Sequence, residues 1–266
     1  MLKGRSGFIT GGAKGIGFAC AKTILERGGQ VVIVDLAPED ELNQAVAALN
    51  HYGPAWGTRA DVTDYAAMQQ AMAFAVEKMG KVDAAVNSAG GGGGGNIYDE
   101  DPEPFIKVVE LCLFGVFHAM KLETMQMIKQ GGGGSIVNIS SINSTVPYYM
   151  YGAYCAAKAG IESLSSCAAM EVGKHKIRIN SICPGFTNTT LIAGFTANPA
   201  VTKEVMDHTP LLRYPPGCGD HRLCRRGGRA IAGSGQGQDR TNAGTALGAA
   251  AGRGRGGSRG GHGPPL

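Results

Sequence analysis

A glycine-rich turn between a short apolar strand and a helical segment is the feature that most constrains the fold. Residues 7–10 are apolar enough for a buried strand, TGGAKGIG overlaps its end, and apolar residues then recur at helical spacing. Glycines let such a turn approach a ligand closely, and the helix start offers N–H groups and a positive dipole to an anion. Asp35 ends the next strand, eighteen residues after Gly17, near the spacing expected for an acid that binds an adenosine ribose. The pattern predicts a dinucleotide-binding βαβ unit.

Strand-like and helix-like segments alternate along the rest of the chain. Apolar strands are expected at residues 31–34, 55–60, 82–86, 135–139 and 177–182. Helices are expected at residues 39–50, 64–79 and 105–129, and again around 154–172. This alternation predicts right-handed crossovers and hence an α/β fold, a doubly wound parallel sheet in the middle of three layers. The glycine run 91–95 interrupts the pattern, and we expect a mobile loop there, at the carboxyl edge of the sheet.

A hydroxyl, a phenol and an ammonium are expected to meet near that edge. Tyr154 and Lys158 are four residues apart, so they share one face of a helix. Ser141 lies thirteen residues before Tyr154, just after a strand-like run. A cation beside a phenol favours the phenolate, which makes Tyr154 a candidate general acid and base for alcohol chemistry. On its own this spacing is more typical of an ordinary amphipathic helix, so the interpretation depends on the dinucleotide site.

The charge of the chain is unevenly distributed. Residues 213–266 hold nine arginines and two aspartates, a net charge of +7, so residues 1–212 carry −3 of the total of +4. Lysine is absent after Lys203, and Gly, Ala, Arg and Pro dominate from about Arg213 without helical or strand periodicity. Such a segment has too little apolar surface to offset the entropy of ordering it, so we expect disorder from about Pro215 to the end.

Two further features concern the compartment in which the chain works. No apolar run approaches the roughly 18 residues needed to span a bilayer, and no charged-then-apolar leader follows Met1. The seven cysteines lack CxxC spacing and several lie in apolar runs, which favours buried thiols over disulfides or zinc. We therefore expect a cytoplasmic protein with no membrane partner and no metal.

Taken together, these motifs resemble those of the short-chain dehydrogenase/reductase family over about residues 1–212. The resemblance lies in seven ordered motifs: TGGAKGIG at 10–17, Asp35, Asp61-Val62, Asn87-Ser88-Ala89-Gly90, Ser141, Tyr154-x-x-x-Lys158 and Pro184-Gly185. It implies a single Rossmann-type catalytic domain, residues 1–212, whose sheet is completed by one further strand near the C-terminus. It also implies an NAD(P)-dependent oxidoreductase that interconverts a secondary alcohol and a ketone by hydride transfer.

The resemblance assigns roles to individual residues. Tyr154 would exchange a proton with the substrate oxygen, and Lys158 would lower its pKa and hold the nicotinamide ribose. Ser141, rather than Ser140, would hydrogen-bond the substrate oxygen. Cofactor contacts are implied for Gly11, Lys14, Gly15, Ile16, Gly17, Asp35, Asp61, Val62, Asn87, Ala89, Gly90, Tyr154, Lys158, Pro184, Gly185, Thr187 and Thr189.

Charge distinguishes the two nicotinamide cofactors. Asp35 would accept hydrogen bonds from both ribose hydroxyls of NAD but would repel the 2′-phosphate of NADP. A basic residue at the position of Lys14 often attends a 2′-phosphate in this family, but this flexible side chain can turn into solvent. We therefore expect NAD, with NADP disfavoured.

The sequence departs from the family pattern in two places. Cys112 stands where the family usually has an asparagine thought to hold a water for proton relay. A thiol is a weak donor and acceptor, so Cys112 is either a poor substitute for that asparagine or only packs in the apolar stripe of its helix, and in either case we expect slower proton exchange.

The second departure is the C-terminal segment. After Tyr214 the expected helix and strand are absent, and the abrupt change of composition favours a reading-frame shift over a selected tail. The last family strand is therefore expected to be missing, which leaves an exposed sheet edge.

The leading interpretation is an enzyme with a small-molecule alcohol or ketone substrate. Phe186, Leu191 and Phe195 lie in a segment, 186–206, that we expect to cover the substrate, and they favour an apolar and even cyclic one. The alternative is a cofactor-binding protein without turnover, owing to Cys112 and the altered C-terminus. The Arg/Gly tail could bind RNA, but no aromatic residue follows Tyr214, which argues against a nucleic-acid partner. With an intact C-terminus, the resemblance implies a homo-oligomer, a dimer or a tetramer.

Overall fold

The computed structural model describes residues 2–187, together with residues 189, 199, 202–203, 207 and 230–231. The chain divides into two units, Met1–Ser234 and Gly235–Leu266, and the described residues all belong to the first. Residues 230–231, inside the segment expected to be disordered, are described as a short strand. The predicted domain boundary at residue 212, the rest of that segment and most of the segment 186–206 lie outside the described residues. These features stay predictions.

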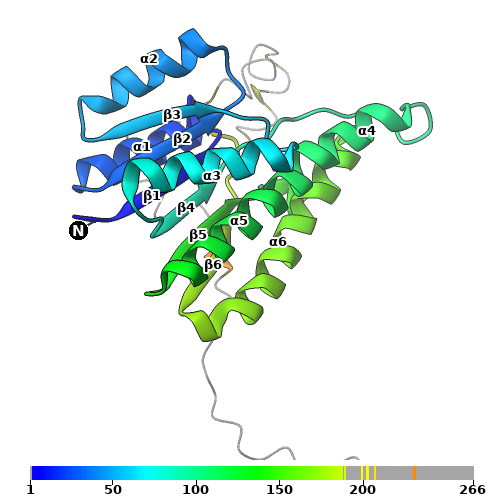
Figure 1. The fold of residues 1–266 in the computed structure, drawn as a ribbon. Helices are drawn as coiled ribbons and strands as arrows, with labels where there is room; N and C mark the ends of the chain where they lie inside the picture. The colour runs from blue at the N-terminus through cyan, green and yellow to red at the C-terminus, as the bar shows by residue number, and fades with distance from the viewer. Residues whose placement is uncertain are drawn as a thin grey trace, which may run out of the picture. The chain divides into compact units, whose positions relative to one another are not determined.

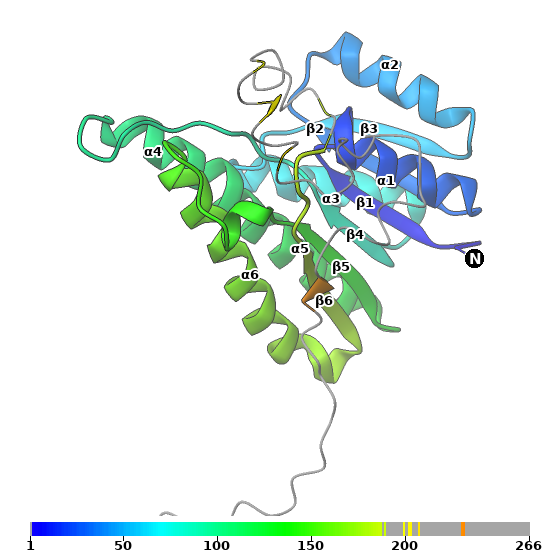
Figure 2. The same cartoon turned by 180° about the vertical axis from the view of Figure 1, so that it is seen from behind.

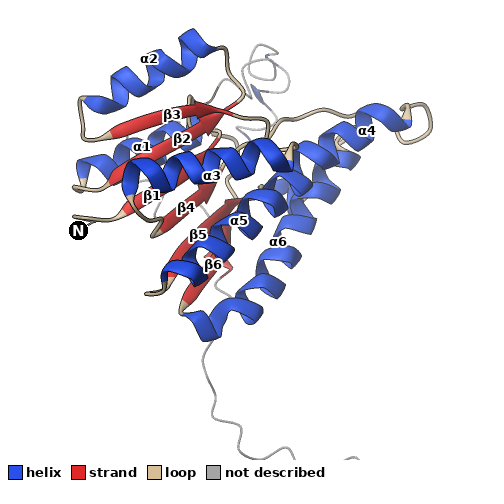
Figure 3. Cartoon of the chain, in the orientation of Figure 1, coloured by secondary structure: helices blue, strands red, loops and turns tan. Residues whose placement is uncertain are grey.

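Six parallel strands form the sheet (Figure 3). They are β1 (Ser6–Thr10), β2 (Gln30–Asp35), β3 (Ala55–Arg59), β4 (Ala84–Asn87), β5 (Gly134–Ile139) and β6 (Ile177–Ile182), in the spatial order β3-β2-β1-β4-β5-β6. The chain winds outward from β1 to β3, then crosses back to β4 and winds the other way. This confirms the doubly wound α/β fold, and it places a crevice at the carboxyl ends of β1 and β4, where the winding reverses.

The edge beyond β6 carries a seventh, very short strand. β7 (Ala230–Ile231) pairs antiparallel with Ser181 and Ile182 of β6. Among the described residues, this pair of residues is all that follows β6 in the sheet. Within the described residues, the parallel part of the sheet thus ends at β6, and the loss of the last family strand stays a prediction.

Helices cover both faces of the sheet (Figures 1 and 2). One face packs against α1 (Gly15–Glu26) and α2 (Glu39–Asn50), and the other against α3 (Tyr65–Met79), α5 (Gly115–Gln130) and α6 (Gly152–Val172). Alternate strand side chains feed the two cores: Ile33 packs with the α1 and α2 side, and Val32 with the α3 and α5 side. The sheet is therefore buried on both faces, which explains its continuous β-branched runs.

The predicted long helix 105–129 is divided in three. α4 (Pro102–Val109) continues into a π-helical turn, η1 (Glu110–Phe114), and then into α5. Gly115, the first residue of α5, lies against Val62, because a Cβ at this position would come within 2.6 Å of Val62 Cγ2. Cys112 lies in this wider turn and is fully buried. Single π-turns of this kind occur frequently at functional sites.

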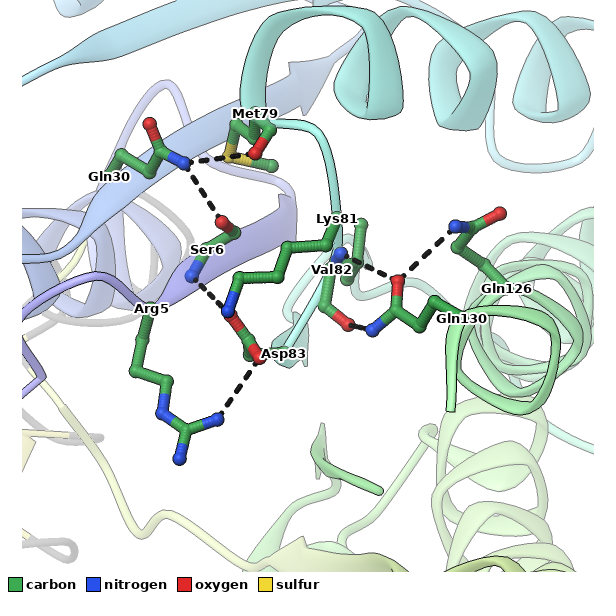
Figure 4. A network of polar contacts seen from close by, with 9 residues as sticks. All are labelled: Arg5, Ser6, Gln30, Met79, Lys81, Val82, Asp83, Gln126 and Gln130. Atoms are coloured by element: carbon green, nitrogen blue, oxygen red, sulfur yellow. Dashed lines mark hydrogen bonds and ion pairs between the residues drawn. The ribbon is translucent and has the colours of Figure 1, made fainter. Parts of the chain in front are cut away.

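Polar side chains link neighbouring segments at the amino edge of the sheet, where the parallel strands begin (Figure 4). Asp83, which precedes β4, accepts hydrogen bonds from Arg5 Nη1 at 3.0 Å and from the backbone N–H of Ser6 at 3.0 Å, and Lys81 Nζ lies 3.1 Å from it. Gln130 at the end of α5 holds the backbone of Val82 through both its N–H and its C=O. These contacts tie β1, β4 and α5 together on the side opposite the crevice.

Three further observations bear on membranes, metals and thiols. No helix within the described residues is long and apolar enough to cross a membrane. In the same part of the chain, no three His, Cys, Asp or Glu side chains gather as metal ligands. Cys112, Cys155, Cys167 and Cys183 are free thiols.

Candidate active site

A cavity of about 460 Å³ opens at the carboxyl ends of the strands. Its walls come from the turn between β1 and α1, the ends of β2 and β4, the segment from β5 into α6, and the residues after β6. The predicted site residues that line it are Gly11, Lys14, Gly15, Ile16, Asp35, Asp61, Val62, Ala89, Gly90, Ser141, Tyr154, Lys158, Pro184, Gly185, Thr187 and Thr189. One cavity therefore joins the predicted dinucleotide loop to the predicted catalytic side chains.

Two predicted cofactor contacts, Gly17 and Asn87, do not line this cavity. Gly17 lies inside α1, and a Cβ there would collide with the carbonyl oxygen of Gly11. Asn87 is buried, and its Nδ2 donates to Glu123 Oε2 at 3.0 Å and to Asn138 Oδ1 at 2.9 Å. Gly17 lies behind the glycine turn, and Asn87 lies in the buried end of β4. A direct contact of either residue with a cofactor stays a prediction.

The turn between β1 and α1 has the properties of a phosphate cradle. Gly11 and Gly15 have φ values of +65° and +61°, in the left-handed region that glycine adopts without strain. A Cβ on Gly11 would lie 2.7 Å from the backbone N of Ala89, so the turn packs tightly against the end of β4. α1 begins at Gly15; its N-cap residue, Lys14, makes no side-chain capping hydrogen bond among the described residues, and the first turn has no acidic residue. Its N–H groups and dipole thus suit an anionic pyrophosphate.

Two aspartates that line the cavity, Asp35 and Asp61, are held by backbone N–H groups and, for Asp61, also by a hydroxyl. Asp35 Oδ2 accepts from Ala13 N at 2.9 Å, and its Oδ1 accepts from Ala37 N at 3.0 Å. Asp61 Oδ1 accepts from the N–H and the hydroxyl of Thr63, both at 2.8 Å. Their orientation is therefore set before any ligand binds, and the Asp35 carboxylate ties the glycine turn to the end of β2.

Ser141, Tyr154 and Lys158 converge at the other end of the cavity. Ser141 caps the short 3₁₀ helix η2 (Ile142–Ser144), with its Oγ accepting from Asn143 N at 3.2 Å. Tyr154 and Lys158 lie one turn apart on α6, and Lys158 Nζ donates to the carbonyl of Ile139 at 2.8 Å. The ammonium lies over the face of the Tyr154 ring, 5.4 Å from its centroid. The three side chains therefore occupy one small region, as the spacing predicts.

The neighbouring Ser140 faces away from this chemistry. Its Oγ donates to the carbonyl of Lys158 at 2.9 Å and contacts Glu162 Oε1 at 3.2 Å. Ser140 is thus committed to α6, although part of it reaches the cavity wall. Ser141 is the better placed of the two serines to meet a substrate oxygen.

Burial dominates the protonation of the phenol and the ammonium. It raises the pKa of Tyr154 to about 12, even though a hydrogen bond with Ser141 acts in the opposite direction. It also lowers the pKa of Lys158. Burial is the largest cause of this shift, so in this structure the pKa of Tyr154 lies above its ordinary value, and the lowering by Lys158 that the family resemblance implies stays a prediction. The phenol is thus protonated at neutral pH and ready to donate.

Cys112 lies directly behind this region. Its Sγ donates to the carbonyl of Gly91 at 3.1 Å, and the side chain is fully buried. A Cβ built on Gly90 would lie 3.6 Å from both Cys112 Sγ and Lys158 Nζ, so the thiol and the ammonium meet at this glycine. Cys112 therefore packs in the apolar interior and also anchors the start of the glycine run. A slower proton exchange caused by this thiol stays a prediction.

Several aromatic lining residues were not predicted as site residues. Tyr148 and Tyr151 line the cavity together with Tyr154 and Phe186. Tyr148, Tyr151 and Tyr154 are spaced by three residues, a spacing that places side chains on one side of a helical turn. This spacing was the available signal, but only Tyr154 also has a lysine four residues later.

Known proteins share both the sequence and the fold. A family model described as short chain dehydrogenase matches residues 7–200. The chain is 37% identical to trans-4-hydroxycyclohexanecarboxylate dehydrogenase of Sinomonas cyclohexanicum over 193 residues, which cover 70% of this chain and 73% of that protein. It is 36% identical over 210 residues to 2,5-dichloro-2,5-cyclohexadiene-1,4-diol dehydrogenase of Sphingobium indicum, covering 79% of this chain and 83% of that protein.

Solved structures agree with this assignment. A short-chain type dehydrogenase/reductase from Mycobacterium ulcerans superposes with a TM-score of 0.77 and 31% identity, covering 80% of this chain and 79% of that chain. Levodione reductase superposes with a TM-score of 0.77 and 28% identity, covering 82% and 87%. The chain therefore belongs to the short-chain dehydrogenase family and is an oxidoreductase acting on CH–OH groups, which interconverts a secondary alcohol and a ketone.

Proposed function

We propose that this dehydrogenase uses NAD to interconvert a cyclic secondary alcohol and its ketone, with Tyr154 as the acid and base. The observation that carries the proposal is the shared cavity, which the glycine turn, Asp35 and Tyr154 all line. Two relatives also carry the names of dehydrogenases for hydroxylated six-membered rings. These names do not favour the alternative of a binding protein without turnover.

Each catalytic side chain has one task in this proposal. The Tyr154 phenol donates its proton to the ketone oxygen in reduction, and the phenolate takes it back in oxidation. Lys158 supplies a buried positive charge that favours the phenolate when it forms, whereas burial raises the pKa of the phenol and lowers that of the ammonium. Ser141 hydrogen-bonds the same substrate oxygen and holds the reacting carbon in place.

The remaining lining residues would hold the nicotinamide dinucleotide. The turn at Gly11–Gly15 and the start of α1 would bind the pyrophosphate, and Asp35 would accept hydrogen bonds from the adenosine ribose. The bound nicotinamide supplies the hydride acceptor in oxidation and the hydride donor in reduction. Because Asp35 is held rigidly by two N–H groups, it cannot turn away from a 2′-phosphate, which supports NAD over NADP.

We extend the proposal to the setting of the enzyme. The free thiols at Cys112, Cys155, Cys167 and Cys183 support a cytoplasmic location, where thiols stay reduced. A homo-oligomer remains our proposal for a chain with an intact C-terminus, and size-exclusion chromatography with light scattering tests it.

An alcohol panel tests the central proposal. We expect the protein to reduce NAD, measured by the absorbance of the reduced nicotinamide, when cyclohexanol is supplied. Tyr154→Phe removes the ionisable oxygen and should abolish turnover while cofactor binding persists. Tyr149→Phe is the matched control, because the Tyr149 side chain is 73% exposed and lies outside the cavity. Cofactor binding without turnover on any alcohol would instead identify a binding protein.

Cofactor preference has its own test. We expect a higher kcat/KM with NAD than with NADP, and we expect Asp35→Ser to narrow the difference by removing the repelling charge. Equal efficiency with the two cofactors in the unaltered enzyme would contradict the role given to Asp35.

A further inference from the structure

The turn between β3 and α3 is closed largely by hydrogen bonds within itself. Asp61 Oδ1 accepts from the N–H and the hydroxyl of Thr63, both at 2.8 Å, and the Asp61 carbonyl accepts from Asp64 N at 3.0 Å. Asp64 in turn caps α3, since its Oδ1 accepts from Ala66 N at 2.8 Å. Asp61 and Val62 line the cavity, so this turn forms part of the cavity wall.

α5 reaches this turn at the Val62 carbonyl. His118, in the first turn of α5, has its Nδ1 3.0 Å from the carbonyl oxygen, and because such an oxygen only accepts, Nδ1 carries the proton and donates it. The imidazole is held by the Tyr65 ring, which it meets at 61° with the two ring centroids 5.3 Å apart. Gly115, three residues earlier, lets the helix approach, because a Cβ there would lie 2.6 Å from Val62 Cγ2.

His118 and Asp61 hold opposite edges of one peptide group. The peptide between Val62 and Thr63 is planar and trans, so its oxygen and its N–H point in opposite directions. The oxygen accepts from His118, and the N–H donates to Asp61 Oδ1. Rotation of this peptide would therefore break both hydrogen bonds at once. By holding the carbonyl, His118 fixes the N–H that orients the Asp61 carboxylate in the cavity wall.

Resting on the function proposed above, we propose that His118 is a positioning residue for the adenosine part of NAD, acting through this peptide on Asp61. Ala60, just before the turn, donates its N–H to the Asp35 carbonyl at 3.1 Å, so the turn lies beside the aspartate proposed to bind the adenosine ribose. The imidazole does not line the cavity, so it acts on a ligand only through the groups that it holds. It affects cofactor affinity and not the chemical step, because the catalytic side chains lie at the other end of the cavity.

Two variants separate the hydrogen bond from the ring. His118→Phe keeps an aromatic ring against Tyr65 and removes the donor, whereas His118→Asn keeps an N–H donor and removes the ring. The probe is ADP, which has the adenosine and pyrophosphate of NAD without the nicotinamide. By isothermal titration calorimetry, we expect its dissociation constant to rise about fivefold for His118→Phe, the equivalent of one hydrogen bond, and to change by less than about twofold for His118→Asn.

Kinetics should show the same division between binding and chemistry. For His118→Phe, we expect KM for NAD to rise in parallel with the ADP dissociation constant, while kcat with cyclohexanol at saturating NAD stays that of the unaltered enzyme. His51→Phe is the matched control, because His51 Nδ1 also lies 3.2 Å from a backbone carbonyl, that of Ala48, but on an exposed helix end outside the cavity. We expect it to change neither quantity.

A double-mutant cycle tests the route through Asp61. In an Asp61→Ala background, His118→Phe should weaken ADP binding little further, because the carboxylate that it positions is gone. A full further loss in that background would contradict the route.

Three other results would overturn the positioning role and leave the dehydrogenase function standing. They are unchanged ADP affinity in His118→Phe, an equal loss of affinity in His118→Asn, and a phenylalanine variant too unstable to assay, which would show that the hydrogen bond serves the fold. An unaltered protein that binds neither ADP nor NAD would instead overturn the function proposed above.

Discussion

The two edges of the sheet use their polar groups in opposite ways. At the amino edge, Asp83 is joined to Arg5, Lys81 and the backbone of Ser6, so charged groups satisfy one another (Figure 4). At the carboxyl edge, Tyr154 lies in a cavity where burial opposes its ionisation. The first edge stabilises the fold, and the second holds reactive groups in place beside open space.

Substitutions at the two edges should therefore have different effects, on stability at the amino edge and on turnover at the carboxyl edge. Side chains at the amino edge bond to other parts of the chain, so their removal should lower the free energy of unfolding and leave turnover intact. Side chains at the carboxyl edge are oriented by backbone atoms, as Lys158 is by the carbonyl of Ile139. Their removal should therefore affect turnover more than the fold.

The largest effect on turnover at the carboxyl edge is expected for Lys158→Met. The variant keeps most of the apolar stem and removes the charge that favours the phenolate, so we expect kcat to fall by about 100-fold or more. The melting temperature should change little, because burial already disfavours the ammonium. Steady-state kinetics beside thermal unfolding checks both parts, and a wild-type kcat would contradict the role of Lys158.

The next largest effect is expected at Glu123, on the pH dependence of stability. This carboxyl bonds to another part of the chain, like the groups of the amino edge, and burial opposes its ionisation, as it does for Tyr154. It lies fully buried against Asn87 near the end of β4, and its Oε1 has no hydrogen-bond partner among the described residues. Burial raises its pKa from 4.5 to about 8, although the hydrogen bond from Asn87 acts in the opposite direction. The folded state thus binds this proton more tightly than the unfolded state does. Its contribution to stability is fully present below pH 4.5 and is lost as the pH rises towards about 8.

Glu123→Gln tests this dependence through urea unfolding across that pH range. Glutamine keeps an oxygen that can accept from Asn87 but does not titrate, so the variant should lose this part of the pH dependence. A variant whose stability falls with pH as steeply as that of the unaltered protein would show that Glu123 titrates normally.

A smaller effect is expected for Asp83→Ala at the amino edge. Burial alone would raise the pKa of Asp83, but the hydrogen bond from Ser6 and the charges of Lys81 and Arg5 together hold it below its ordinary value. The carboxylate therefore contributes stability at neutral pH that is lost as the pH falls through its folded pKa. We expect the variant to lose about 2 kcal/mol at neutral pH and to show a weaker acid dependence. Unchanged urea unfolding would contradict this.

Arg5→Ala is the control for that prediction. The Arg5 side chain is 59% exposed, so its ion pair should contribute less than about 1 kcal/mol. Both variants should keep the turnover of the unaltered enzyme at saturating substrate. A lower turnover in either variant would contradict the claim that the amino edge serves stability and not activity.

Cys112→Asn is expected to have the smallest effect, a modest rise in turnover. An amide is a stronger donor and acceptor than a thiol, and from this position it can still bond the carbonyl of Gly91. Cys112→Ala supplies neither group and should not raise turnover. Stopped-flow and steady-state rates check the prediction, and an unchanged or lower turnover for the asparagine variant would remove it.

Features with a clear period or a local motif could be predicted from the sequence. The helix at 39–50 and the strand at 177–182 have the predicted bounds, and the glycine turn, Asp35, Ser141, Tyr154 and Lys158 meet at one cavity as expected. These predictions are confirmed because the spacing of apolar residues determines the helices and strands, and because the carboxyl ends of parallel strands bring the residues that follow them together.

Features that depend on packing between distant segments could not be predicted. The π-helical turn at 110–114 has no sequence period of its own, and the close approach of the next residue, Gly115, to Val62 joins segments about fifty residues apart. The glycine run reads as flexible, yet its fit against Met150 depends on a segment more than fifty residues later. The pKa of Tyr154 is governed by burial, which a spacing of four residues does not report.

A crystal structure with NAD bound would test the central claim most directly. It should show the pyrophosphate at the start of α1, the adenosine ribose at Asp35 and the Tyr154 hydroxyl beside the nicotinamide. A complex in which the Tyr154 ring oxygen points away from the nicotinamide would contradict the account.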